Sequence, residues 1–338
     1  MIRLSVRKLT FFLTLLGTSS CASAHVTSRP EQGALPIAGR LLQIAHVLSL
    51  AKIDSTWPGL KLPSGYGLCT TKDTAMYVTH DSMPWPERVI TRNQVAMSKF
   101  AYILSPVPDD LSFPCVDLEY AGTGGGRIII SYMESMNHLD GWLPANIAFI
   151  VHESFHGHQS RTFPSTKGDP AYQVGQNPPL DSVVVNSHAF QNRIAKERVL
   201  LANAVRATTL AETFKVVREY IAIRSERELL LPQPQRGVEA HLERVEGTAQ
   251  FVGYEVAVIS TGPRTRLTDV IASDLLDENR YQSGLYQTMH VYDTGAAICY
   301  LLNRIAPEWR KQVEAGVTPW ALLQSTAAQR NSPEPRHN

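Results

Sequence analysis

The sequence predicts an α+β fold, in which a small mixed N-terminal part precedes a mainly helical part. Between Trp57 and Pro114 the chain has short extended runs broken by Pro and Gly, which is typical of strands and turns. From Ser187 onward, apolar residues recur at helical spacing. We expect a leader at residues 1–24, an α/β part at 25–143, a helical part at 144–330 and a disordered tail at 331–338.

The first 24 residues have the three regions of an export signal. A positively charged start is followed by a short apolar run at residues 9–17, and Ala22-Ser23-Ala24 predicts cleavage before His25. The apolar run is too short to cross a bilayer, and no later stretch is long enough. We therefore expect an exported protein, periplasmic or secreted, with no integral membrane span. The alternative is a lipoprotein anchored through Cys21.

The clearest strand of the N-terminal part is Arg127–Met133. We expect it at the edge of a sheet, where it can pair with an extended peptide; the alternative is an internal strand without a ligand. Shorter strands are expected at residues 75–78 and 101–104, and helices at residues 37–53, 187–208, 211–231, 238–259, 281–305 and 320–328.

Charge and cysteine content restrict the partners and the redox chemistry. The net charge is +1 and the pI about 7.8, so no nucleic-acid partner is indicated. Oligomeric state is left open. In an exported chain Cys69 and Cys115 are candidates for a disulfide, whereas Cys299 lies in an apolar run and is expected to be a buried free thiol.

Residues 152–156 read His-Glu-Ser-Phe-His after an apolar run without a helix breaker. Residues four apart lie on one face of a helix, so His152 and His156 can bind one Zn²⁺. Glu153 is turned about 100° away from His152, which suits a general base acting on a water at the metal. The alternative is an ordinary helix with one packed and one solvated histidine.

A catalytic zinc site needs a third protein ligand, and the residues that follow His156 do not supply one. A glycine and a histidine three and six positions further on would extend the motif, but Gln159 and Thr162 occupy those positions. His158 is two residues on and faces another direction. The third ligand must therefore come from another helix.

Glu246 is the best candidate for this ligand. Its helical neighbours Leu242, Ala249 and Gly253 form a face that ought to be buried, and a buried carboxylate needs a compensating cation. We expect Gly247 and Ala249 to let this helix approach the metal-binding helix closely. The alternative is a salt bridge from Glu246 to an arginine such as Arg244. Glu239 and Glu243 lie towards another side of the helix, where they can be solvated.

Three motifs together resemble the gluzincin zinc peptidases, in particular the aminopeptidase-N-like group. They are H-E-x-x-H at 152–156, E-G-T-A at 246–249 and Y-D-T-G-A at 292–296. The resemblance implies that His152, His156 and Glu246 bind zinc and that Glu153 is the general base. It also implies that Tyr292 stabilises the oxyanion, a role that suits a phenol hydroxyl.

The chain departs from that family in two respects. Glu246 follows His156 by about 90 positions, far more than in the family, so residues 187–231 resemble an insertion between the ligands. The family's substrate-amine motif, G-x-M-E-N, is absent. Glu134 in Tyr132-Met133-Glu134-Ser135 is a weak substitute as a substrate-binding residue.

We therefore expect an exported zinc-dependent metallohydrolase, a peptidase in which metal-activated water cleaves an amide bond. One alternative is a zinc amidohydrolase acting on a cell-wall or small-molecule amide. Another is a non-catalytic protein whose structural zinc is closed by a fourth ligand, for which His158, His188 and His290 are the candidate donors. A helical scaffold without metal is the third.

Overall fold

The structure is a computed structural model of the 338-residue chain. It describes residues 48, 55–60, 65–69, 74–80, 91–94, 100–106, 117–121, 125–131, 142–164, 187–231, 233–262, 266–281 and 286–330. Several predictions of the sequence lie outside these ranges: the leader with Cys21, most of the helix at 37–53, Cys115, Glu134 and the tail at 331–338. Of Cys69 only the backbone is described.

The chain divides into two compact units. The first comprises residues 1–157 and 255–262, and the second comprises residues 158–254 and 263–338. Two helices, α3 (Trp142–Thr162) and α8 (Thr248–Thr261), contribute residues to both units. Among the helices that the structure describes, none combines the length and apolar character needed to cross a bilayer.

The backbone of the first unit forms one six-stranded sheet in the order β3-β4-β2-β1-β6-β5. β1 and β6 pair in parallel, with Tyr66 opposite Ile128, and the other neighbouring strands are antiparallel. The strands are β1 (Gly65–Cys69), β2 (Thr74–His80), β3 (Thr91–Gln94), β4 (Phe100–Pro106), β5 (Asp117–Ala121) and β6 (Gly125–Ser131).

The predicted α+β fold with an edge strand at 127–133 is wrong. The part of the chain in which the structure describes side chains as well as backbone is 84% helical and contains no strand. In addition, β6 lies between β1 and β5, so both of its sides are paired and neither can take up an extended peptide. A run of apolar residues indicates a strand, but its place in the sheet depends on distant partners.

The second unit is helical, and capping residues define several of its helix starts. The hydroxyl of Ser187 accepts from the backbone of Phe190 at the start of α5, and Thr209 caps α6 in the same way. Thr318 caps α12, with Pro319 in its first turn. The helices are α5 (His188–Arg206), α6 (Leu210–Glu228), α7 (Gln233–Leu242), the π-helix η6 (Glu243–Gly247), α9 (Leu267–Leu276), the 3₁₀ helix η7 (Glu278–Tyr281), α10 (Tyr286–Ile305), α11 (Trp309–Glu314) and α12 (Pro319–Gln329).

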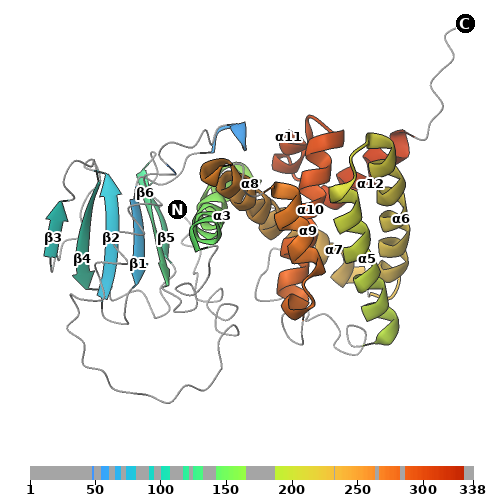
Figure 1. The fold of residues 1–338 in the computed structure, drawn as a ribbon, viewed down its shortest axis with the longest axis horizontal. Coiled ribbons are helices and arrows are strands. Elements are labelled where there is room, and N and C mark those ends of the chain that lie inside the picture. Colours follow the sequence, from blue (N-terminus) through green and yellow to red (C-terminus); the bar gives the residue numbers. More distant parts are fainter. Residues whose placement is uncertain are drawn as a thin grey trace, which may run out of the picture. The chain divides into compact units, whose positions relative to one another are not determined.

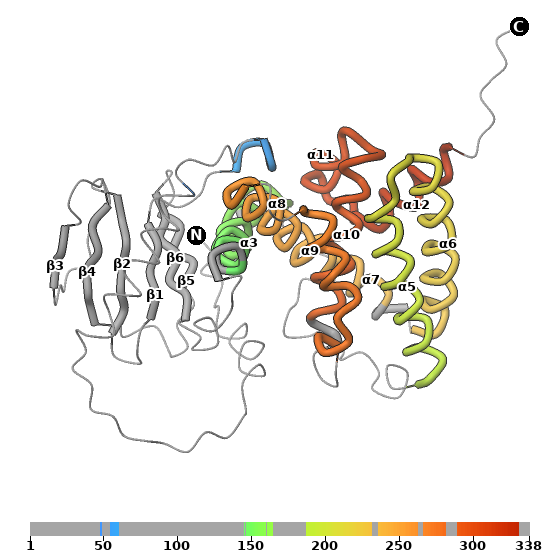
Figure 2. Tube along the Cα trace, in the orientation of Figure 1, coloured from blue at the N-terminus to red at the C-terminus, as the bar shows by residue number. Residues whose placement is uncertain are grey.

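The predicted helices at 187–208, 211–231 and 320–328 are confirmed by α5, α6 and α12. α5 and α6 run side by side as a hairpin (Figure 1), and α10 packs against α5 (Figure 2). The helix expected at 238–259 begins earlier, at Gln233, and contains a π-turn. The short helices α9 and α11 were not predicted. Aromatic and aliphatic side chains fill the core of this unit, among them Phe190, Val217, Phe251, Trp309 and Leu323.

Candidate metal centre

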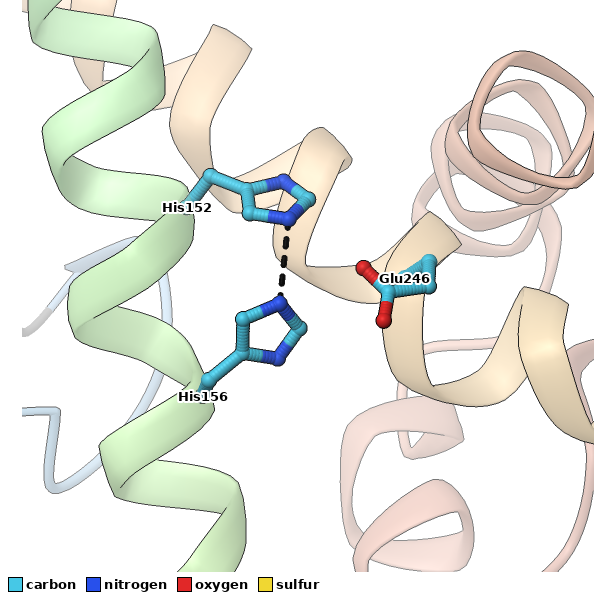
Figure 3. Close-up of side chains that lie close together, drawn as sticks. All are labelled: His152, His156 and Glu246. Carbon is cyan, nitrogen blue, oxygen red and sulfur yellow. Dashed lines mark hydrogen bonds between the residues drawn. The ribbon is translucent and has the colours of Figure 1, made fainter. Parts of the chain in front are cut away.

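His152, His156 and Glu246 offer ligand atoms that all lie within 4.8 Å of one another. Figure 3 shows the two imidazoles on successive turns of α3 and the carboxylate of Glu246 directed towards them. The Nε2 atoms of His152 and His156 are 3.0 Å apart. Two nitrogens bound to one tetrahedral Zn²⁺ would be separated by about 3.3 Å, so the two rings are close to the geometry of a shared cation.

The helix that carries the histidines buries one apolar face. Ile147, Val151 and Phe155 follow one another at intervals of four residues, so they share a face, and all three are completely buried. His152 is 3% exposed and His156 is half-buried. A buried imidazole needs a polar partner, and the edge of the His156 ring meets that of His152, with the two ring planes at 84°.

Glu153, which follows His152 in the sequence, is buried, with 8% of its surface exposed. Its Oε2 atom is inaccessible to solvent and has no hydrogen-bond partner among the residues that the structure describes. Leaving a carboxylate oxygen unsatisfied inside a protein costs free energy. Such a group is expected where a substrate, a water molecule or a cation completes the environment.

The carboxylate of Glu246 comes from η6, a π-helical turn. π-Turns are short insertions into α-helices that occur frequently at functional sites. Glu246 is half-buried, and the face predicted around it is partly confirmed, since Ala249 is completely buried. Arg244, the alternative partner considered for Glu246, donates its Nε to the carbonyl oxygen of Val313 at 2.9 Å.

The close approach expected of Gly247 is made to α10. A Cβ atom on Gly295 would lie 2.6 Å from the Cα of Gly247, so the two backbones touch. We expected Gly247 to allow close contact with the metal-binding helix, but the close contact that it makes is with α10. The position of the glycine in the sequence indicated a close approach but not the helix approached.

Glu239 and Glu243 are buried, against the expectation that they are solvated. Arg224 donates to both oxygens of Glu243, at 2.7 and 2.9 Å, and Arg227 donates to Glu239 at 2.6 and 2.8 Å. Burial alone would raise the pKa of Glu239, but Arg227 and Arg224 outweigh it and hold that pKa well below the ordinary value. Glu197 completes the network through Arg227.

This network also reaches the helix that carries Tyr292. The hydroxyl of Thr294 donates to Glu243 at 2.8 Å, which ties α10 to η6. Tyr292 is half-buried on α10, one turn before the contact of Gly295 with η6. The residue therefore lies on the helix that packs directly against the Glu246 segment, although it is not among the three potential ligands.

The three candidate fourth ligands do not join the group. His158 lies 3.2 Å from Glu314, and burial lowers its pKa. His290 lies 3.2 Å from Glu239, and burial lowers its pKa as well. His188 is exposed at the start of α5. Within the described part of the chain, the cluster thus consists of three donors.

Sequence reasoning missed Gln159 and the buried arginines of α6. The sequence showed only that Gln159 stands where a longer zinc motif would have a glycine, and no role was predicted for its side chain. The spacing of Arg224 and Arg227 on one helix, with Glu239 and Glu243 on the next, was the available signal for the ion-pair network. The prediction of a buried free thiol at Cys299 is confirmed.

No known protein family, no curated protein and no solved structure matches this chain.

Proposed function

We propose that this protein is a zinc-dependent hydrolase that cleaves a peptide bond. The observation that carries the proposal is the convergence of His152, His156 and Glu246 within 4.8 Å. Two imidazoles and one carboxylate form a donor set typical of catalytic zinc. Glu153, the residue after His152, has a buried oxygen without a hydrogen-bond partner in the described residues, and it supplies the base that hydrolysis needs.

In this proposal the cation is held by the two histidines of α3 and by Glu246 of η6. A bound Zn²⁺ supplies a Lewis acid that polarises a carbonyl group and makes water more acidic. Glu153 accepts the proton from the attacking water and returns it to the leaving amine. The phenol of Tyr292 donates a hydrogen bond to the oxygen on which charge develops.

The number of donors favours catalysis over a structural role. Structural zinc sites are closed by four protein ligands, whereas catalytic sites keep one position open. His158 and His290 are each engaged with a carboxylate, and in the described residues the group has three donors. A site of this composition leaves one position for water or substrate.

Elemental analysis of the purified full chain, followed by hydrolysis assays, tests the proposal. We expect about one zinc per chain, cleavage of peptides in a fluorogenic library, and loss of cleavage on treatment with a chelator. Absence of zinc would refute the metal site itself. Zinc without cleavage of any peptide, but with release of amine from a cell-wall or small-molecule amide, would establish the amidohydrolase alternative.

A further inference from the structure

The side chain of Gln159 connects the helix of the histidines to the segment that carries Glu246. Its Nε2 atom donates to the carbonyl oxygen of Val245 at 2.7 Å and to the hydroxyl of Thr248 at 2.8 Å. Gln159 is 6% exposed. An amide nitrogen has two hydrogens to give, and both of these bonds end on the chain immediately before and after Glu246 and Gly247.

The two acceptors of Gln159 lie where the π-turn η6 meets α8. A π-turn disrupts the regular α-helical hydrogen bonds, and the carbonyl oxygen of Val245 accepts from the backbone of Thr248 as well as from Gln159. The hydroxyl of Thr248 in turn donates to the carbonyl oxygen of Arg244 at 2.6 Å. Gln159 therefore binds to Val245 within the π-turn and to Thr248, the first residue of α8.

The same turn alters the direction in which Glu246 points. In an α-helix, Glu246 would lie only about 60° around the axis from Glu243, which faces Arg224 in the buried network. Each residue of a π-turn advances by less than the about 100° of an α-helix. Glu246 is consequently turned further from the arginine side of the helix.

We infer that Gln159 is a positioning residue, which fixes η6 against α3 so that Glu246 faces His152 and His156. The inference rests on the proposed function, because the geometry that Gln159 maintains is that of the metal ligands. Gln159 follows His156 by three residues, less than one helical turn. The residue that makes the hydrogen bonds to Val245 and Thr248 is therefore close to the ligand His156 on the same helix.

The chemistry of these acceptors requires an amide at position 159. A glutamate would place a carboxylate against two oxygen acceptors, and a leucine would remove the hydrogen bonds that Gln159 donates to Val245 and Thr248. Both substitutions keep the approximate length of the side chain. Outer residues that orient metal ligands typically contribute about 10–100-fold to metal affinity.

The experiment compares Gln159→Leu and Gln159→Glu with the wild-type full chain. Zn²⁺ affinity is measured by competition with a chromophoric chelator, and the coordination geometry is read from the visible absorption of the Co²⁺-loaded protein. We expect affinity to fall by about 10–100-fold and the Co²⁺ spectrum to change. Thr213→Val is the matched control, since Thr213 is completely buried and its hydroxyl donates to the carbonyl oxygen of Thr209, the residue that caps α6.

A second variant covers the case in which Gln159→Leu does not fold. Thr248→Val preserves side-chain shape and removes one of the two acceptors, so we expect a smaller loss of affinity, of about tenfold or less. Wild-type affinity and an unchanged Co²⁺ spectrum in folded Gln159 variants, or in Thr248→Val if those variants do not fold, would overturn the positioning role alone. A wild-type chain that binds no zinc would instead overturn the proposed function.

Discussion

Gly247 on η6 and Gly295 on α10 touch backbone to backbone. A Cβ atom on Gly295 would lie 2.6 Å from the Cα of Gly247 and 3.0 Å from the carbonyl oxygen of Glu243. Such separations leave no room for a methyl group, and neither neighbour is a side chain that can turn aside. The contact sets the distance between the segment of Glu246 and the helix of Tyr292.

Gly295→Ala is therefore expected to lower the free energy of unfolding by about 1–3 kcal/mol, the usual cost of overpacking a closed interior. Gly237→Ala on α7 is the control, since a Cβ there meets no atom within 4 Å. That substitution should stabilise the helix by up to about 1 kcal/mol. Urea denaturation of both variants measures the difference, and equal stabilities would show that the interface relaxes.

The ligand pair on α3 could be predicted because it depends on local geometry alone. Residues four apart on a helix share a face, so His152 and His156 had to meet if the run was helical. Glu246 was identified because an acid on an apolar helical face needs a partner, and the structure brings it to the histidines. In each case the signal was contained in a few neighbouring residues.

The remaining features depend on contacts between distant segments. The residues next to Glu243 in the sequence do not show that Arg224, on another helix, neutralises it. The sequence therefore predicted a solvated side chain at Glu243. The π-turn at η6 shifts the helical register without a Pro or Gly pair to indicate it. The place of β6 inside its sheet likewise depends on β1 and β5, which its own residues do not specify.

Glu153→Gln tests the general base. The amide cannot accept the proton of the attacking water, so we expect hydrolysis to fall by about 10²–10⁴-fold while zinc content stays at the wild-type level. Initial rates on a cleaved peptide, together with elemental analysis, provide the measurement. Glu226→Gln, on an exposed side chain of α6, is the control. An undiminished rate in Glu153→Gln would assign the base to another group.

Glu246→Ala tests the third ligand. Removal of one of three donors should weaken zinc binding by more than the about 10–100-fold typical of an outer residue, because the cation loses a direct bond. The chelator competition assay measures it, with the exposed Glu219→Ala as the control. If zinc affinity in the Glu246 variant equals that of the control, a different acid completes the site.

The Arg224–Glu243 pair predicts that the effects of two substitutions on stability are not additive. Both side chains are 0% exposed, and removing one partner of a buried pair leaves an uncompensated charge. Arg224→Met should therefore destabilise the chain by about 3–5 kcal/mol. In Arg224→Met with Glu243→Met the charge is absent, so the double variant should regain part of that loss in urea denaturation. A double variant as unstable as the sum of the two single variants would show that the pair is not coupled.

Asp293 predicts a pH dependence of stability with a definite sign. Burial outweighs the hydrogen bonds from Arg280 and Tyr281 and raises the pKa of Asp293 from 3.8 to about 6. Between these values the folded chain holds a proton that the unfolded chain has released, so the contribution of Asp293 is greatest below about pH 4 and is lost as the pH rises to about 6. The shift corresponds to about 3 kcal/mol.

Asp293→Asn removes this titration and leaves a side chain of similar shape. The unfolding free energy of wild type minus that of the variant should therefore decrease as the pH rises from about 4 to about 6, and then stay constant. Urea denaturation at intervals of half a pH unit measures the difference, and subtraction cancels the titration of the remaining groups. A difference that stays nearly constant over this interval would mean that burial does not raise the pKa of Asp293 above its ordinary value.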